Sequence, residues 1–117
     1  MRYMCLIYGD EAAFGELSPD EQGQVFAAYN AFDKELAAAG NVKIAGAPLK
    51  SVTHATTVRV RDGKIRSTDG PFAETKEQLG GYYIFECRDL NEALGWAAKI
   101  PGAKDGSIEV RPVLELS

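Results

Sequence analysis

Two strand-like runs with apolar residues on both faces constrain the fold of this chain most strongly. In residues 2–8, Tyr3, Cys5 and Ile7 alternate with Met4, Leu6 and Tyr8, and residues 82–87 repeat the pattern. Successive side chains of a strand point to opposite faces of the sheet, so both faces of the sheet holding these runs need a cover. The 117 residues suffice for one core, which predicts a single domain over residues 1–117.

Two helices are expected to provide one of these covers. Ser18, Pro19 and Glu21 form an N-cap, a first helical residue and a capping box, and Gly40 ends the helix. The expected apolar stripe of this helix is Val25, Tyr29, Phe32 and Leu36.

The second helix begins after its cap Asp89 and stops at Pro101. Its expected buried stripe is Leu90, Ala93, Leu94 and Ala97, with Trp96 on the flank.

The remaining strands are expected at residues 42–49, 56–61, 64–68 and 107–116. Asp62-Gly63 predicts a hairpin turn, and Pro112 predicts that the last strand lies at a sheet edge or ends its pairing there. Residues 11–17 are expected to form a loop, and residues 73–78 a single helical turn.

This order of elements predicts an α+β domain, a ferredoxin-like antiparallel sheet with two helices on one face. The other face would then expose an apolar patch too large for a monomer, formed by Met4, Leu6, Tyr8, Tyr82 and Ile84. A second copy of the chain would cover that face, so the pattern predicts a homodimer.

Composition argues against several classes of partner. The net charge is −4 and no run of Lys and Arg stands out, which argues against direct nucleic-acid binding. Apolar runs are shorter than a bilayer span and no signal-peptide pattern is present, so a cytoplasmic protein without membrane contact is expected. Cys5 and Cys87 form no CxxC and the only histidine is His54, which predicts buried free thiols and no metal site.

Three stretches together resemble the YCII-related, or DGPF, family. They are residues 68–77 (TDGPFAETKE), 79–83 (LGGYY) and 107–112 (SIEVRP). The resemblance implies a dimeric α/β barrel of two ferredoxin-like subunits, with a pocket between helices and sheet near the Asp-Gly-Pro turn. It also implies that some relatives are linked with extracytoplasmic-function sigma factors, and that others carry a His–Asp pair proposed as catalytic.

Asp69 matches the acidic residue of the family motif, and His54 lies in the loop before the third strand. Asp69 is suited to act as a general acid or base, or to accept backbone N–H groups in its own turn. His54 is suited to proton transfer, or is a plain surface residue. Asp69 and His54 are the candidate catalytic residues.

Four further residues are candidates for substrate binding: Arg59, Gly70, Pro71 and Tyr82. Arg59 can hold a carboxylate or form an ion pair. Gly70-Pro71 makes a sharp turn, and Tyr82 follows two glycines that leave room for a ligand or for close backbone packing.

Two functions fit these residues. One is binding of an unidentified small molecule, with cofactor-free acid–base chemistry of an isomerase, lyase or dehalogenase type. The alternative is a non-catalytic binding or regulatory module associated with an extracytoplasmic-function sigma factor. No phosphate loop, nucleophile elbow or zinc signature is present, so no cofactor is predicted.

Overall fold

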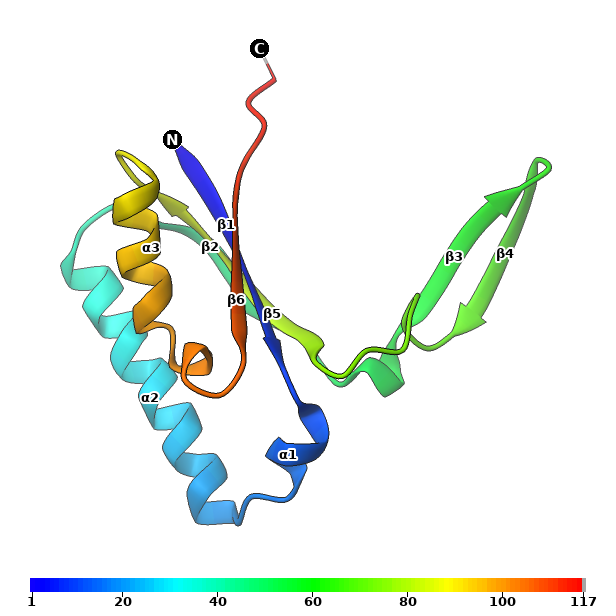
Figure 1. Cartoon of the computed structure of the whole chain (residues 1–117), viewed down its shortest axis with the longest axis horizontal. Coiled ribbons are helices and arrows are strands. Elements are labelled where there is room, and N and C mark those ends of the chain that lie inside the picture. Colours follow the sequence, from blue (N-terminus) through cyan, green and yellow to red (C-terminus); the bar gives the residue numbers. More distant parts are fainter. Residues whose placement is uncertain (117) are drawn as a thin grey trace.

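A computed structural model describes residues 1–116 as an antiparallel sheet with helices on one face and a hairpin that extends beyond it (Figure 1). The strands are β1 (Arg2–Gly9), β2 (Lys43–Pro48), β3 (Thr56–Arg61), β4 (Lys64–Asp69), β5 (Gln78–Glu86) and β6 (Ser107–Pro112). The α-helices are α1 (Glu11–Gly15), α2 (Pro19–Ala38) and α3 (Leu90–Lys99), and two short 3₁₀ helices are η1 (Val52–His54) and η2 (Pro101–Ala103).

The main sheet has the strand order β2-β5-β1-β6, and all its neighbouring strands are antiparallel. Helices α2 and α3 lie on the same side of it (Figure 1). The predicted α+β, ferredoxin-like architecture is therefore confirmed. β6 is an edge strand that ends at Pro112, as the missing N–H of proline requires.

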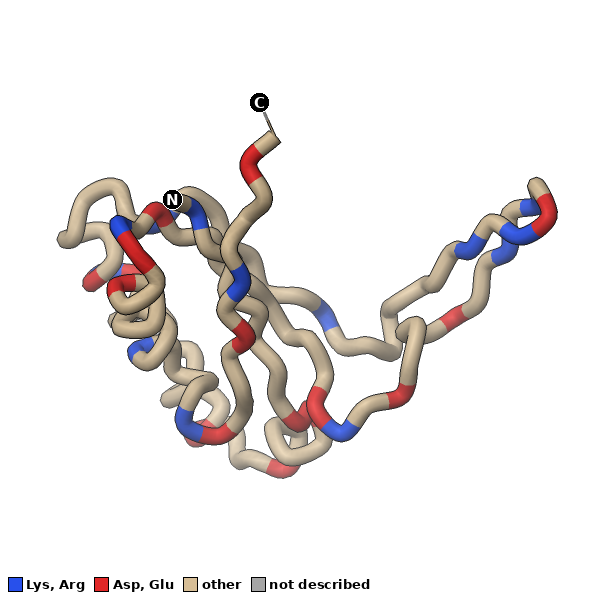
Figure 2. Tube along the Cα trace, turned by 45° about the horizontal axis from the view of Figure 1, so that its top comes forward, with Lys and Arg blue, Asp and Glu red and all other residues tan. Residues whose placement is uncertain are grey.

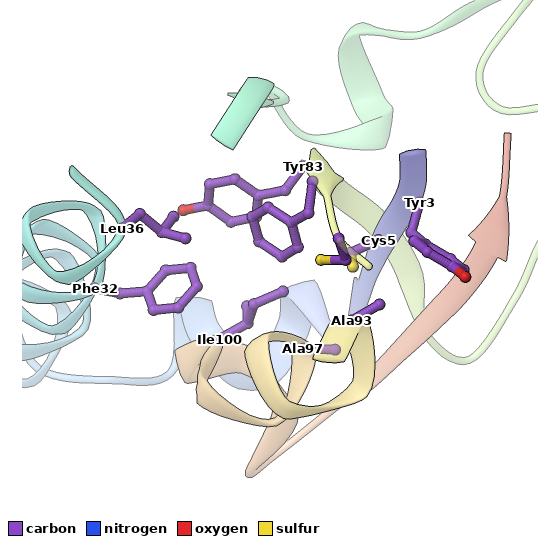
Figure 3. Packing of buried hydrophobic residues seen from close by; sticks show 10 residues of the cluster. Tyr3, Cys5, Phe32, Leu36, Tyr83, Ala93, Ala97 and Ile100 are labelled. Atoms are coloured by element: carbon purple, nitrogen blue, oxygen red, sulfur yellow. The ribbon is translucent and has the colours of Figure 1, made fainter. Parts of the chain in front are cut away.

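The core lies between the sheet and the two long helices (Figure 3). The side chains buried on this side come from alternate positions of β1 and β5, from α2 and α3, and from the residues that directly follow β5 and α3. They are Tyr3, Cys5, Phe32, Leu36, Tyr83, Phe85, Cys87, Ala93, Ala97 and Ile100. Met4, Leu6, Tyr82 and Ile84 point to the other side and are only half-buried. One face of the sheet thus has a cover within the chain and the other does not.

Both predicted helix caps are present. The Ser18 hydroxyl accepts the Glu21 N–H at 3.2 Å, and the Glu21 carboxylate accepts the Ser18 N–H at 2.9 Å, which completes the capping box. Asp89 accepts the Glu92 N–H at 2.9 Å at the start of α3. Gly40 follows the end of α2 with φ of 91°, a left-handed value suited to glycine.

Two local predictions are wrong. Residues 11–15 form helix α1 rather than a loop, because the Asp10 carboxylate accepts the N–H groups of Ala12 and Ala13 and caps a short helix. Residues 73–78 form no helical turn, and β5 already begins at Gln78, four residues before the expected strand.

The expected buried stripe of α3 is also partly wrong. Leu90 and Leu94 are 47% and 45% exposed, whereas Ala93 and Ala97 are buried and Trp96 packs against the core. The small alanines let the helix approach the sheet closely, so the stripe runs through positions 93, 96, 97 and 100 and leaves the leucines on its flank.

Gly81, near the start of β5, serves strand packing. A Cβ on Gly81 would lie 3.0 Å from the Ala47 carbonyl oxygen of β2, so glycine is needed where these two strands approach. Tyr82, which follows Gly81, is half-buried on the bare face of the sheet.

β3 and β4 form a two-stranded sheet of their own, here called the hairpin arm (residues 56–69). Asp62 and Gly63, at its tip, have φ values of 54° and 72°, the conformation that the Asp-Gly pair predicts. The arm points away from the body (Figure 1), and the radius of gyration is 16.3 Å. A compact domain of this length would have about 13 Å.

Three further properties concern residues 1–116. Both cysteines are free and buried, as the sequence predicts. No helix in this range is long and apolar enough to cross a membrane. The same range holds no group of three or more His, Cys, Asp or Glu side chains placed to bind a metal ion.

Candidate functional site

Two hollows lie next to each other on the described part of the chain. The larger, here called the helix groove, runs between α2 and the sheet and has a volume of about 1480 Å³. The smaller, here called the hairpin-base pocket, lies where the arm leaves the body and has a volume of about 850 Å³. Small-molecule sites span roughly 300–1,000 Å³, so only the smaller hollow has the size of a ligand pocket.

The hairpin-base pocket is built around the Asp-Gly-Pro turn. The Gly70 N–H donates to the Ala55 carbonyl at 2.7 Å, and the Thr57 hydroxyl donates to the Gly70 carbonyl at 2.8 Å. Gly70 has φ of 102°, which a side chain would strain. These bonds hold Pro71 and Phe72 against the first strand of the arm, where they line the pocket.

Glu11 fixes the neighbouring wall. Its carboxylate accepts the Ser51 hydroxyl at 2.8 Å and the Val52 N–H at 3.1 Å, while its own N–H donates to the Gln78 side chain at 3.0 Å. Helix α1, η1 and the start of β5 are thereby joined. No local sequence pattern indicates this role, because the partners of Glu11 lie 40 or more residues away.

The two candidate catalytic residues lie at the same end of the arm. His54 ends η1 and lines the hairpin-base pocket. Asp69 ends β4 and is exposed; it pairs with Thr56, which also lines the pocket. Asp69 itself is not among the lining residues, and among residues 1–116 its carboxylate accepts no hydrogen bond from the chain and pairs with no cation.

The candidate substrate-binding residues are divided among three places. Pro71 forms part of the pocket wall, and Gly70 precedes it in the turn without lining the pocket. Tyr82 borders the helix groove instead, but its side chain is on the opposite, bare face of the sheet. Arg59 lies in β3, opposite Arg66, and lines neither hollow.

Two phenols of the helix groove are poor proton donors. The Tyr83 hydroxyl donates to Asp33 at 3.1 Å, and the ammonium of Lys43 lies 3.7 Å from the same carboxylate oxygen. Burial, together with the Asp33 charge, raises the pKa of Tyr83, and burial raises the pKa of Tyr29. Both phenols therefore stay protonated near neutral pH.

The thiols are equally unsuited to chemistry. Burial raises the pKa of Cys5 to about 11, and burial with the Glu92 carboxylate raises that of Cys87. A thiol reacts as its thiolate, so neither cysteine is an activated nucleophile. Neither the buried phenols nor the buried thiols are therefore suited to proton transfer near neutral pH.

The fold and the pocket define an α+β protein with a ligand-sized hollow beside an Asp-Gly-Pro turn. The YCII-related domain matches residues 1–117, and the chain belongs to this family. An uncharacterized protein of Rhizobium meliloti (strain 1021) is 39% identical over 115 residues, which cover 97% of this chain and 92% of that protein.

A solved structure shares the fold. It is that of 5-chloro-2-hydroxyhydroquinone dehydrochlorinase (TftG) from Burkholderia phenoliruptrix AC1100, in complex with 2,5-dihydroxybenzoquinone. The TM-score is 0.56 at 15% identity, with 97% of this chain and 94% of that chain covered.

Proposed function

We propose that the chain binds a small polar or aromatic molecule in the hairpin-base pocket and acts on it by cofactor-free acid–base chemistry. One observation carries the proposal: a hollow of ligand size has His54 in its wall and the Asp69 turn at its rim. The dehydrochlorinase with the same fold acts, by its name, on a chlorinated hydroxyhydroquinone. Dehalogenation is therefore the first reaction class to test.

In this proposal Asp69 removes a proton from the substrate, and the electron pair left behind expels a leaving group such as chloride. His54 carries the proton on, because an imidazole exchanges protons near neutral pH. Pro71 forms part of the wall and Gly70 makes the turn before it, whereas Tyr82 and Arg59 lie outside this pocket and have no part in the proposed binding. The comparisons give no support to the alternative of a sigma-factor module.

The proposal includes a homodimer. The bare sheet face holds Met4, Leu6, Tyr82 and Ile84, which are half-buried in the single chain. A second copy packed on this face would remove the exposed apolar area from water. Sedimentation that finds only monomer at micromolar concentration would refute this part.

The test compares Asp69→Asn with Asp62→Asn, a matched change at the other end of the same arm. Thermal shift against chlorinated hydroquinones, quinones and small hydroxy acids reports binding, and chloride release reports turnover. Asp69→Asn should keep the melting temperature and bind the same compounds, while turnover falls by about 10²–10⁴-fold. Asp62→Asn should leave ligand binding and turnover unchanged.

Two results would contradict the proposal. In one, no compound in the panel stabilises the wild-type chain. In the other, Asp69→Asn turns over as fast as the wild type. If this variant also has a lower melting temperature and unchanged ligand binding, Asp69 is a structural turn residue.

A further inference from the structure

One face of the hairpin arm is apolar and has no cover. Alternation in β3 and β4 places Val58, Val60 and Ile65 on the same face, and they are 62%, 59% and 79% exposed. An isolated two-stranded hairpin is at best marginally stable in water. A surface that packs on this face would therefore stabilise the arm.

The other face of the arm is basic. The strand register places Arg59 directly opposite Arg66 and Arg61 directly opposite Lys64. Like charges at directly opposed positions destabilise a hairpin. Within residues 1–116 no carboxylate forms an ion pair with any of the four cations, which Figure 2 shows gathered toward the tip of the arm. An anionic surface that packs on this face would offset the repulsion among the four cations.

The body of the molecule has the opposite charge. Residues 56–69 carry four cations and two carboxylates, whereas the whole chain has a net charge of −4, so the remainder carries −6. Residues 3–33 contain no Lys, Arg or His. They hold the acidic side chains Asp10, Glu11, Glu16, Asp20, Glu21 and Asp33.

The helix groove combines this charge with an apolar surface. Phe14 and Phe26 line it and pack edge to face with ring centroids 6.1 Å apart, yet they are 37% and 60% exposed. Asp10, Glu11 and Glu21 line the same groove. Its volume exceeds that of a small-molecule site, so a segment of polypeptide fits it better.

The arm points away from the groove of its own chain. Figure 1 shows it leaving the end of the sheet that lies near α1 and extending to the side opposite to α2. We propose that the hairpin arm of one copy docks into the helix groove of a second copy. The valines and Ile65 lie against the phenylalanines, and the long basic side chains reach the carboxylates at the rim.

This contact is distinct from the covering of the bare sheet face and does not rest on the proposed acid–base chemistry. In a two-fold dimer both arms and both grooves would be used, since each chain carries one of each. Because the hairpin-base pocket lies where the arm leaves the body, docking of the arm on a second copy would also fix this pocket in place.

The first test is Arg59→Glu, measured by sedimentation equilibrium over a range of concentrations. Placed opposite Arg66, a glutamate converts a repulsive pair into an attractive one, so the arm itself should become more stable. Docking into an acidic groove should nevertheless weaken, with a rise of about tenfold or more in the dissociation constant. Lys76→Glu is the control, with the same change in net charge at an exposed position outside both hollows.

The second test locates the contact. A carbodiimide joins lysines to neighbouring carboxylates, and an equal mixture of ¹⁴N- and ¹⁵N-labelled chains separates links between chains from links within one. Lys64 should form mixed-isotope links to the acidic residues between positions 10 and 21.

Equal dissociation constants for Arg59→Glu and Lys76→Glu would overturn the proposal. So would links from Lys64 only to its own chain, or to residues outside the groove, which would leave a sheet-face dimer with free arms. A wild-type chain that stays monomeric at every concentration would overturn it as well.

Discussion

The body and the hairpin arm are built by the same rules of alternation but differ in what covers them. In β1 and β5 the alternate side chains Tyr3, Cys5, Tyr83 and Phe85 are buried on the face that the helices cover, and Cys5 and Phe85 are fully buried. In β3 and β4 no residue except Thr57 is even half-buried, although the apolar residues alternate as regularly. Alternation thus specifies which face of a strand is apolar and leaves open which molecule covers it.

The largest expected difference concerns single apolar side chains. Leu36 is 1% exposed in the core, and Leu36→Ala should lower the free energy of unfolding by about 2–5 kcal/mol because it leaves a cavity. Ile65 is 79% exposed, and Ile65→Ala should change the free energy of unfolding by less than about 0.5 kcal/mol in dilute solution. Urea unfolding followed by circular dichroism measures the change in free energy for each variant. Equal losses in the two variants would contradict the difference drawn here between the body and the arm.

Burial in the body should also make its stability depend on pH. The pKa of Cys5 is about 11 when folded against 9.0 for a free thiol, so the fold favours the neutral form. Its contribution is complete below pH 9 and is lost as the pH rises toward 11, a loss of about 2–3 kcal/mol at most. Unfolding of Cys5→Ala should depend less on pH between 9 and 10; the same slope in both proteins would count against this account.

A smaller effect is expected at the start of α2. Ser18→Ala removes the acceptor for the Glu21 N–H and should cost about 0.5–2 kcal/mol. Ser67→Ala on the exposed arm is the matched control and should cost almost nothing in dilute solution. If both serines proved equally dispensable, the capping box would not be what starts this helix.

Local patterns were sufficient to predict much of the body. Ser18, Gly40 and Asp89 mark helix ends through bonds or backbone angles that involve only nearby residues, and Asp62-Gly63 does the same for the hairpin. The apolar face of β1 that meets the helices also follows from alternation alone.

The missed features depend on distant contacts. Helix α1 has a local cap in Asp10, but Ser51 and Gln78 hold Glu11 from 40 and 67 residues away. The orientation of α3 depends on how closely two alanines let it approach the sheet, and a hydrophobic stripe alone does not distinguish Leu94 from Trp96. Alternation likewise could not show that β3 and β4 form a sheet of their own.

The same limit applies to the candidate site. The Asp-Gly-Pro turn is visible in the sequence, and His54 lies 15 residues before Asp69. His54 and Asp69 lie at the base of the same arm because Thr56 of β3 pairs with Asp69 of β4, and this contact between strands leaves no local pattern in the sequence. The separation of Tyr82 and Arg59 from the pocket is also a property of the folded chain.

Hydrogen exchange at two protein concentrations tests the central claim, that the arm depends on a second copy and the body does not. Amides of β1 and β5 should exchange slowly at both concentrations, since their strands lie inside the main sheet. Amides of β3 and β4 should exchange fast when the chain is dilute and become protected as it associates. Arm amides that exchange equally at both concentrations, fast or slow, would contradict the account.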